Sequence, residues 1–211
     1  MDTAFVPGKS NKRLVESLTG KGKCRIIEYG GCGLLNYVQQ PSYEPRKEVK
    51  VFLYVGRLAE EKNLRILLDV FNELPDLKLL IVGQGALKDS LRNNANSNIQ
   101  FLGSMKNKEL KNIYRKADVF ILPSKYEPWG LVVEEALNNG TPVIVSDKVG
   151  CKDDLVTVDT GLVFSHNSPE DLKEKIKTIS NVSYYNQLRL GVSRMDFTKR
   201  SQLQVESFCS L

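Results

Sequence analysis

Short apolar runs alternate with amphipathic segments between residues 49 and 164, and this alternation is the feature that most constrains the fold. The apolar runs have the length of strands, and the segments between them carry apolar residues at helical spacing, as Leu64, Leu67 and Phe71 do. Strands that alternate with helices require a parallel sheet covered on both faces. The predicted strands are residues 49–55, 77–82, 99–102, 118–123, 141–145 and 161–164. The predicted fold class is therefore α/β, a Rossmann-like parallel sheet with helices on both faces.

Helices are predicted between these strands and after the last of them. The predicted helices cover residues 61–74, 86–94 and 108–116, a segment from near 129 to 140, and a segment that begins at Ser168 with proline at its first position. Before residue 49 we expect a turn over 5–8, a helix over 10–18 with Ser10 as its N-cap, a strand over 24–28, a bend over 29–33 and a loop over 34–48. From residue 183 onward the pattern indicates two further helices, broken near residues 195–198.

Composition narrows the class of protein. With 211 residues and 41% hydrophobic content, the chain is long enough for one α/β domain with extra helices. It has no apolar run of transmembrane length and no apolar core of a signal peptide near its start. Four cysteines without a Cys-x-x-Cys pair and a single histidine argue against a zinc site. We therefore expect reduced, mostly buried thiols and a cytoplasmic protein.

The net charge of +5 is concentrated near the N-terminus, where six cations face few acids. They are Lys9, Lys12, Arg13, Lys21, Lys23 and Arg25. A nucleic-acid partner is not favoured, because no aromatic residues are interleaved with these cations and no binding motif accompanies them. A solvated basic face is the simpler interpretation.

Polar chemistry concentrates in residues 124–140, between two predicted strands. Glu127 falls in the loop at the carboxyl end of a strand, where ligands bind in open α/β sheets, and Glu135 falls about two turns into the following helix. By spacing alone, both glutamates would be ordinary solvated side chains. The intervening Pro128-Trp129-Gly130 places free amides and the positive end of the helix dipole at the ligand edge. The stretch therefore favours a negative ligand, with Glu127 accepting from its neutral hydroxyls.

Residues 127–135 resemble the Glu-x7-Glu signature of retaining GT-B glycosyltransferases, in the large group 1 (family 4) class. Residues 136–146 continue the pattern of that family, and residues 51 to about 175 follow it in order. The resemblance is to the C-terminal half, which holds the nucleotide-sugar donor. It implies that residues 1–48 are a remnant of the N-terminal domain and the interdomain linker, that 49–182 are the donor-binding domain, and that 183–211 are helices that cross to a missing N-terminal domain.

The resemblance also implies a phosphate clamp. In such enzymes, Arg and Lys at the positions of Arg57 and Lys62 hold the diphosphate of the donor, and the chemistry suits the task. A planar guanidinium grips phosphate oxygens in pairs, and a lysine adds a point charge. Both would stabilise the charge that grows on a leaving diphosphate. Without the resemblance, the same residues would be two cations on a surface loop.

The remaining donor contacts are implied in the same way. Gly56, Gly83 and Gly85 would wall the nucleotide pocket, and the backbone of Ser104 and Met105 would meet the base. Glu127 with the amides of Trp129, Gly130 and Leu131 would hold the sugar, and Glu135 would bind the ribose diol. A dinucleotide site at Gly83-Gln84-Gly85 is a weaker interpretation, because the third glycine and the acidic partner are lacking. Trp129 could also be a core aromatic residue, which is compatible with a role in the site.

Two further features bear on cofactors. The sequence lacks the Asp-x-Asp metal signature of another glycosyltransferase class, so we expect no metal and no cofactor. His166 is predicted to lie on the surface, and Asp153-Asp154 to start a helix. The resemblance places the catalytic-region histidine and the acceptor pocket in the N-terminal domain, outside this chain.

The sequence therefore predicts the donor-binding domain of a retaining glycosyltransferase that moves a sugar from a nucleotide-diphosphate sugar, expected to be a UDP-sugar, to a glycan or lipid-linked acceptor. The fragment alone should bind nucleotide but transfer sugar poorly. Peripheral association with the inner face of a membrane is consistent with the family. Two alternatives remain open: a non-catalytic nucleotide-sugar-binding or scaffold module, and a sugar-nucleotide epimerase or glycogen-type phosphorylase of the same architecture.

Overall fold

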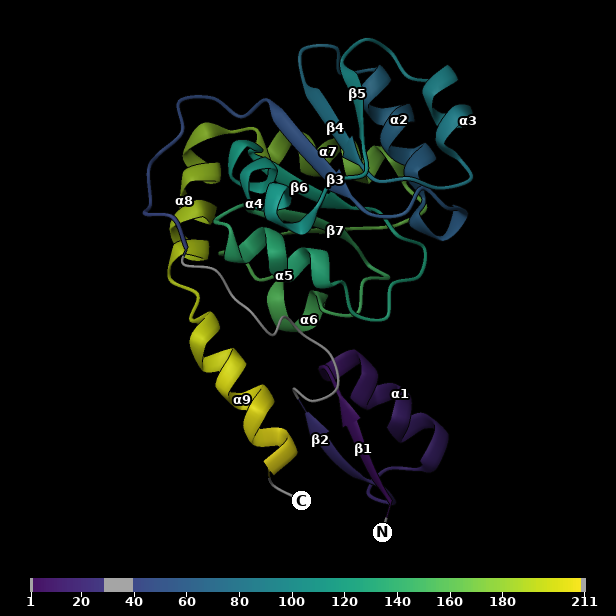
Figure 1. Cartoon of the computed structure of the whole chain (residues 1–211), viewed down its shortest axis with the longest axis vertical. Coiled ribbons are helices and arrows are strands. Elements are labelled where there is room, and N and C mark those ends of the chain that lie inside the picture. Colours follow the sequence, from purple (N-terminus) through teal and green to yellow (C-terminus); the bar gives the residue numbers. More distant parts are fainter. Residues whose placement is uncertain (1, 29–39, 210–211) are drawn as a thin grey trace.

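The computed structural model describes residues 2–28 and 40–209 (Figure 1). The predicted bend at 29–33, with Cys32 in it, and the first part of the predicted loop at 34–48 lie outside the described residues. A six-stranded sheet with its helices forms the larger part of the chain. A two-stranded sheet with one helix forms a smaller unit at the N-terminal end.

The six strands are parallel, in the order β5-β4-β3-β6-β7-β8. Their bounds are β3 Val51–Val55, β4 Lys78–Val82, β5 Ile99–Gly103, β6 Val119–Leu122, β7 Val143–Ser146 and β8 Gly161–Phe164. Every residue of β6 and β7 is buried, as expected for strands covered on both faces. The predicted α/β class and all six predicted strands of the sheet are confirmed.

The order of the strands creates a switch point. From β3 the chain adds β4 and β5 toward one edge, and then crosses back to add β6, β7 and β8 toward the other. Right-handed crossovers consequently place the helices on opposite faces, so that α2 packs against α3 and α7, whereas α4 packs against α5. The connections that leave the carboxyl ends of the neighbouring strands β3 and β6 therefore diverge, and ligands bind at such a point.

The helices match the predicted ones with shifted ends. They are α2 Leu64–Asn72, α3 Lys88–Asn93, α4 Asn107–Lys116, α5 Leu131–Asn138, α6 Lys152–Leu155, α7 Pro169–Ile179, α8 Val182–Ser193 and α9 Phe197–Cys209. The predicted N-cap Ser168 accepts a hydrogen bond from the Asp171 amide at 3.0 Å.

One helix predicted to start at residue 61 is divided in two. A 3-10 turn over Glu60–Lys62 precedes α2, and Asn63 between them is left-handed, with φ 56°. Asparagine tolerates that conformation better than most residues. Its side-chain Nδ2 donates to the carbonyls of Pro123 at 3.2 Å and His166 at 2.9 Å. The Asn63 side chain at this break therefore connects the loop after β3 to the loops after β6 and β8.

The N-terminal unit differs from the prediction. Thr3–Val6 forms strand β1, which pairs in parallel with β2, Arg25–Glu28, where a turn was expected over 5–8. Helix α1 runs from Lys9 to Thr19, and its N-cap is Gly8, not Ser10. A strand of only four residues gives too short a periodic pattern to separate it from a turn.

The C-terminal helices lie apart from the main core. In Figure 1, α9 extends away from α8 toward the N-terminal unit, and the Phe208 ring stacks on Phe5 with centroids 5.1 Å apart. Leu203 and Val205 remain 37% and 59% exposed, so described residues cover these two apolar side chains only in part. The expectation of mostly buried thiols is wrong: Cys151 is buried, but Cys24 is half-buried and Cys209, at the end of α9, is exposed.

Candidate functional site

A pocket of about 320 Å³ opens at the switch point between β3 and β6. Its walls are the loop after β3, the loop after β6 and the first turn of α5. Of the predicted site residues, those that line the pocket are Gly56, Arg57, Lys62, Glu127, Trp129, Gly130 and Leu131. Gly83, Gly85, Ser104, Met105 and Glu135 are not among its lining residues. The fold thus brings seven of the twelve predicted residues around one cavity.

Lys62 and Glu127 form an ion pair across this pocket, with Nζ 2.6 Å from Oε2. Their side chains are 15% and 14% exposed, so the pair is largely withdrawn from water. Removal of one partner from such a pair leaves the other as a buried charge. The two residues that were assigned separately, one to phosphate and one to sugar, therefore form a single electrostatic unit in this structure.

Arg57 lies at the rim of the pocket and is held more loosely. Its side chain is 77% exposed and lies 3.1 Å from the Glu61 carboxylate. Its backbone is fixed, because the buried Tyr54 hydroxyl donates to the Arg57 carbonyl at 2.8 Å. Burial is also the main reason that the pKa of Tyr54 lies above its usual value. The loop is therefore rigid while the guanidinium remains accessible to a ligand.

Gly83 and Gly85, in the loop after β4, are required by close packing of two backbone segments. A Cβ on Gly83 would lie 1.8 Å from the Gly56 carbonyl oxygen, and a Cβ on Gly85 would lie 2.3 Å from the Leu58 carbonyl oxygen. The Leu58 amide donates to the Gln84 carbonyl at 2.9 Å. These glycines allow the two loops to pack together, and so support the pocket from behind.

The mouth of α5 is shaped by Gly130, whose φ of 104° requires glycine. Trp129 just before it is 3% exposed. Its indole Nε1 donates to Glu134 Oε1 at 3.0 Å, and Glu134 is fully buried. The sequence analysis predicted no role for Glu134, because the motif assigns the ligand contact to its neighbour Glu135. Trp129 could have indicated this role, since a buried indole N–H needs an acceptor nearby.

Glu135 is half-buried on the side of α5 that faces α4. The Tyr114 hydroxyl donates to Glu135 Oε2 at 2.8 Å. Burial raises the pKa of Glu135, and this hydrogen bond opposes the rise. The contact with ribose assigned to Glu135 remains a prediction, as do the backbone contacts assigned to Ser104 and Met105.

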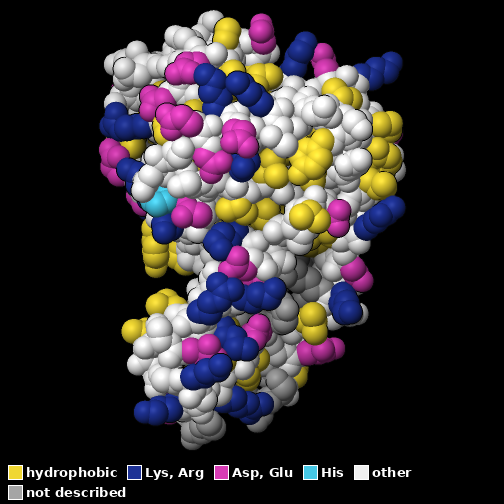
Figure 2. All heavy atoms as spheres, turned by 180° about the vertical axis from the view of Figure 1, so that it is seen from behind, with side chains coloured by type: hydrophobic (Ala, Val, Ile, Leu, Met, Phe, Trp, Pro, Cys, Tyr) yellow, Lys and Arg dark blue, Asp and Glu magenta, His cyan; other side chains and the backbone are white. Residues whose placement is uncertain are grey.

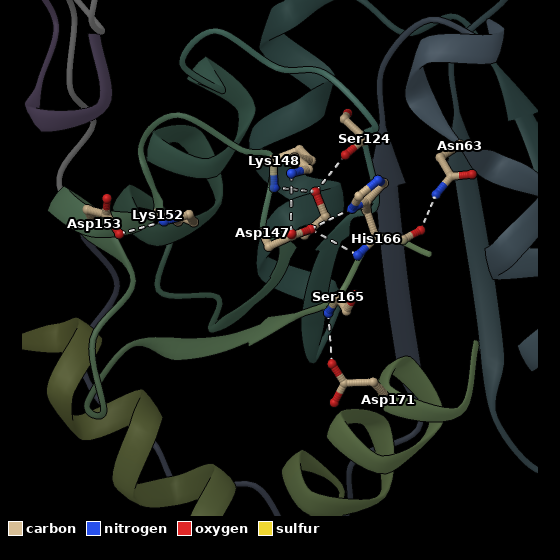
Figure 3. Close-up of polar contacts among 10 residues, drawn as sticks. Asn63, Ser124, Asp147, Lys148, Lys152, Asp153, Ser165, His166 and Asp171 are labelled. Carbon is tan, nitrogen blue, oxygen red and sulfur yellow. Dashed lines mark hydrogen bonds and ion pairs between the residues drawn. The ribbon is translucent and has the colours of Figure 1, made fainter. Parts of the chain in front are cut away.

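A second polar cluster lies at the same sheet edge, after β7 and β8 (Figure 3). His166 Nδ1 lies 2.8 Å from Asp147 Oδ1, and the His166 side chain is only 17% exposed, so its prediction as a surface residue is wrong. Burial raises the pKa of Asp147, but hydrogen bonds from His166 outweigh it and leave the pKa lowered. The contact of the His166 carbonyl with Asn63 links this cluster to the loop that carries Lys62.

The N-terminal unit docks beside the pocket through α6. The predicted helix start at Asp153-Asp154 lies within α6, and both acids also reach α1. Asp154 Oδ2 accepts from the Lys9 amide at 3.1 Å, and Asp153 Oδ2 lies 2.8 Å from Arg13 Nη1. A Cβ on Gly8 would lie 2.6 Å from the Trp129 ring. The start of α1 therefore packs against the pocket's aromatic wall.

Comparisons with known proteins agree with this geometry. The family model "Glycosyl transferases group 1" matches residues 38–190, and the chain belongs to that family. Sulfoquinovosyl transferase SQD2 of Arabidopsis thaliana is 33% identical over 141 residues, which are 64% of this chain and 27% of that protein. The chain thus spans well under half the length of this curated relative.

Solved structures share the fold. A sucrose-phosphate synthase from Thermosynechococcus elongatus superposes with a TM-score of 0.77 at 25% identity, over 97% of this chain and 55% of that chain. HepE from Anabaena, solved in complex with UDP and glucose, superposes with a TM-score of 0.73 at 18% identity, over 98% of this chain and 63% of that chain. The latter likeness establishes the shared fold alone.

The buried Trp129–Glu134 contact yields a prediction about stability. Glu134→Ala should lower the free energy of unfolding by about 1–3 kcal/mol, because the indole N–H would lose its acceptor in a dry interior. Glu135→Ala should also be destabilising, because the buried Tyr114 hydroxyl would lose its acceptor, so the matched control is Glu174→Ala, whose side chain is 72% exposed and whose removal should leave stability unchanged. Urea unfolding followed by tryptophan fluorescence measures these effects. If Glu134→Ala unfolded at the same urea concentration as wild type, the contact would have no structural role.

Proposed function

We propose that this chain is the donor-binding part of a retaining glycosyltransferase that transfers a sugar from a UDP-sugar to a glycan or lipid-linked acceptor. The observation that carries the proposal is the Lys62–Glu127 pair beside the mouth of α5, in a pocket at the switch point of a group 1 glycosyltransferase fold. The complex of HepE with UDP supports the choice of base.

The pair suggests how a donor would be accommodated. A diphosphate carries more negative charge than one carboxylate, so Lys62 would turn from Glu127 to the phosphate oxygens when the donor enters. Glu127 would then be left to accept hydrogen bonds from the sugar hydroxyls. One charged contact replaces another, and the lysine need not be stripped of water a second time.

The remaining residues would act around that exchange. Arg57, already at the rim, would grip the outer phosphate oxygens, and the amides at the start of α5 would face the same charge. These donors are placed where charge develops as the diphosphate leaves, so they would stabilise the transition state more than the ground state. Glu135 would bind the ribose, and the backbone at Ser104 and Met105 the base.

We propose that the reaction uses no metal or other cofactor. The positive charge of Arg57 and Lys62 would take the role that a metal ion has in other glycosyltransferases. In residues 2–28 and 40–209, no group of three or more His, Cys, Asp or Glu side chains could hold a metal ion. The sequence also lacks an Asp-x-Asp motif.

The proposal assigns acceptor binding to a partner domain outside these 211 residues. Residues 1–48 would be its last part together with the linker, 49–182 the donor domain, and 183–211 the helices that return to it. The separate sheet of β1 and β2, and the extension of α9 toward it, support this division (Figure 1). The chain alone would bind nucleotide and transfer sugar poorly.

Titration with nucleotides tests the proposal. UDP should bind the wild-type chain, UMP more weakly and NAD not at all. Arg57→Ala should weaken UDP binding about tenfold or more, because charge-assisted hydrogen bonds to phosphate would be lost. Arg57 is exposed, so the fold should be unaffected. Lys62→Ala combined with Glu127→Ala removes both charges together and should abolish binding.

Arg65→Ala is the matched control, since Arg65 is another exposed arginine, paired with Glu60 on the same segment. Its UDP affinity should equal that of wild type. UDP binding that survived in Arg57→Ala and in the Lys62→Ala/Glu127→Ala variant would show that the diphosphate lies elsewhere.

We also propose peripheral association with the inner face of an anionic membrane, and no nucleic-acid partner. In the described residues, no helix is long and apolar enough to cross a membrane. Leu14 and Leu18, one turn apart on α1, are 54% and 78% exposed. Lys and Arg side chains gather over the N-terminal lobe, the lower one in Figure 2. Such a combination favours the interface of an anionic bilayer.

Vesicle flotation tests this association. The chain should float with vesicles that contain phosphatidylglycerol, and not with phosphatidylcholine alone. Leu14→Ser combined with Leu18→Ser should abolish flotation while UDP affinity is unchanged. Equal flotation of the variant, or equal binding to neutral vesicles, would contradict a role for α1.

A further inference from the structure

A second cavity, of about 280 Å³, lies at the opposite edge of the sheet from the donor pocket. Ala117 and Thr141 on its wall come just before β6 and β7, so the cavity opens at the amino ends of the strands. The remaining walls come from the segment 41–46, the end of α4, the turn after α5, and α8. None of its lining residues lines the donor pocket.

Three arginines converge on this cavity: Arg46, Arg115 and Arg189, here called the arginine cavity. Only one acidic residue, the exposed Glu44, lines it among the described residues. Three guanidinium groups on one small concave surface repel one another, and that repulsion falls when an anion is bound. The lining therefore favours a ligand with more than one negative charge.

Arg46 is preorganised by its neighbours. Its backbone amide donates to Asn186 Oδ1 at 2.8 Å, and Asn186 Nδ2 donates back to the Arg46 carbonyl at 2.9 Å. One terminal guanidinium nitrogen of Arg46 donates to the Arg115 carbonyl at 3.0 Å. The Asp118 carboxylate lies 3.6 Å from its Nε. The backbone and one side of the guanidinium are thus fixed before any ligand arrives.

Arg189 approaches from α8 and is half-buried. It makes no ion pair with any residue in the described part of the chain. Its side chain hydrogen-bonds to the oxygen of Tyr185, a neutral group whose hydroxyl donates to the Asp118 carbonyl at 2.8 Å. The positive charge of Arg189 is consequently not neutralised by a carboxylate at this wall, in contrast to that of Arg46.

An acceptor lies on the same wall. Asn139 is 7% exposed, and its Nδ2 donates to the Glu135 carbonyl at 2.9 Å. That bond fixes the orientation of the amide, and its buried Oδ1 has no hydrogen-bond partner among the described residues. A buried acceptor of this kind is satisfied by a hydroxyl or by water. The cavity thus combines several donors for an anion with one acceptor for a hydroxyl.

We propose that the arginine cavity binds a phosphate monoester of a small hydroxylated molecule, of the size of a monosaccharide phosphate. The guanidinium groups would hold the phosphate, and Asn139 would accept from a hydroxyl. The volume of about 280 Å³ is at the low end of small-molecule pockets, which suits a ligand of this size. The site is separate from the donor pocket and does not depend on the function proposed for it.

Helix α5 connects the two sites. Its first turn walls the donor pocket, and Asn139 immediately after its last turn walls the arginine cavity. The Asn139 amide and side chain both hydrogen-bond to the Glu135 carbonyl. A ligand bound to Asn139 would therefore contact the C-terminal end of the helix that carries Glu135.

Isothermal titration of the whole chain with glucose 6-phosphate tests the proposal, with UDP present at saturation to block the donor pocket. Saturable binding is expected at constant ionic strength, tighter than that of inorganic phosphate. Arg189→Gln should weaken it about tenfold through loss of a charge-assisted contact, and Arg189→Lys should lie in between. Arg92→Gln, an exposed arginine elsewhere, and Arg57→Ala should bind as wild type does.

Circular dichroism confirms that each variant is folded, and unchanged UDP affinity confirms it further for the Arg189 and Arg92 variants. Three results would overturn the proposal: no saturable binding at millimolar glucose 6-phosphate, equal affinity in wild type and in folded Arg189→Gln, or loss of binding in Arg57→Ala. The last result would place the phosphate in the donor pocket.

Discussion

The ion pair between Lys62 and Glu127 is the contact on which the candidate site depends. Both side chains are largely shielded from water, so neither can lose its partner without a replacement charge. The pair lies where the loops after β3 and β6 meet, at the one place where the order of the strands makes neighbouring connections diverge. A ligand that offers Lys62 a stronger anion, and Glu127 a set of hydroxyls, satisfies both at once.

Much of the surrounding structure serves to hold these two loops in register. Asn63, left-handed beside Lys62, donates to carbonyls of the loops after β6 and β8. The glycines after β4 let their loop pack directly on the backbone at Gly56. On the other side, the buried Trp129–Glu134 contact fixes the turn that leads into α5. The pocket is therefore assembled from backbone positions that several distant segments determine together.

The sequence predicted the sheet and most helices because their apolar residues recur with a clear period, as in α2 and β4. Arg57, Lys62, Glu127 and Trp129, which the family resemblance singled out, gather at the switch point because all four follow strands that end at one edge. The sequence did not predict β1, which has only four residues, or the break at Asn63, which is stabilised by contacts more than 50 residues away. The sequence also did not predict which side chains pair. The ion pair of Lys62 with Glu127 and the contact of His166 with Asp147 depend on tertiary geometry alone.

A crystal structure of the chain with UDP tests the central claim most directly. We expect the diphosphate between Arg57, Lys62 and the first amides of α5, with Lys62 Nζ moved from the Glu127 carboxylate to a phosphate oxygen. A structure in which the Lys62–Glu127 pair stays closed and the diphosphate binds at another surface would contradict it.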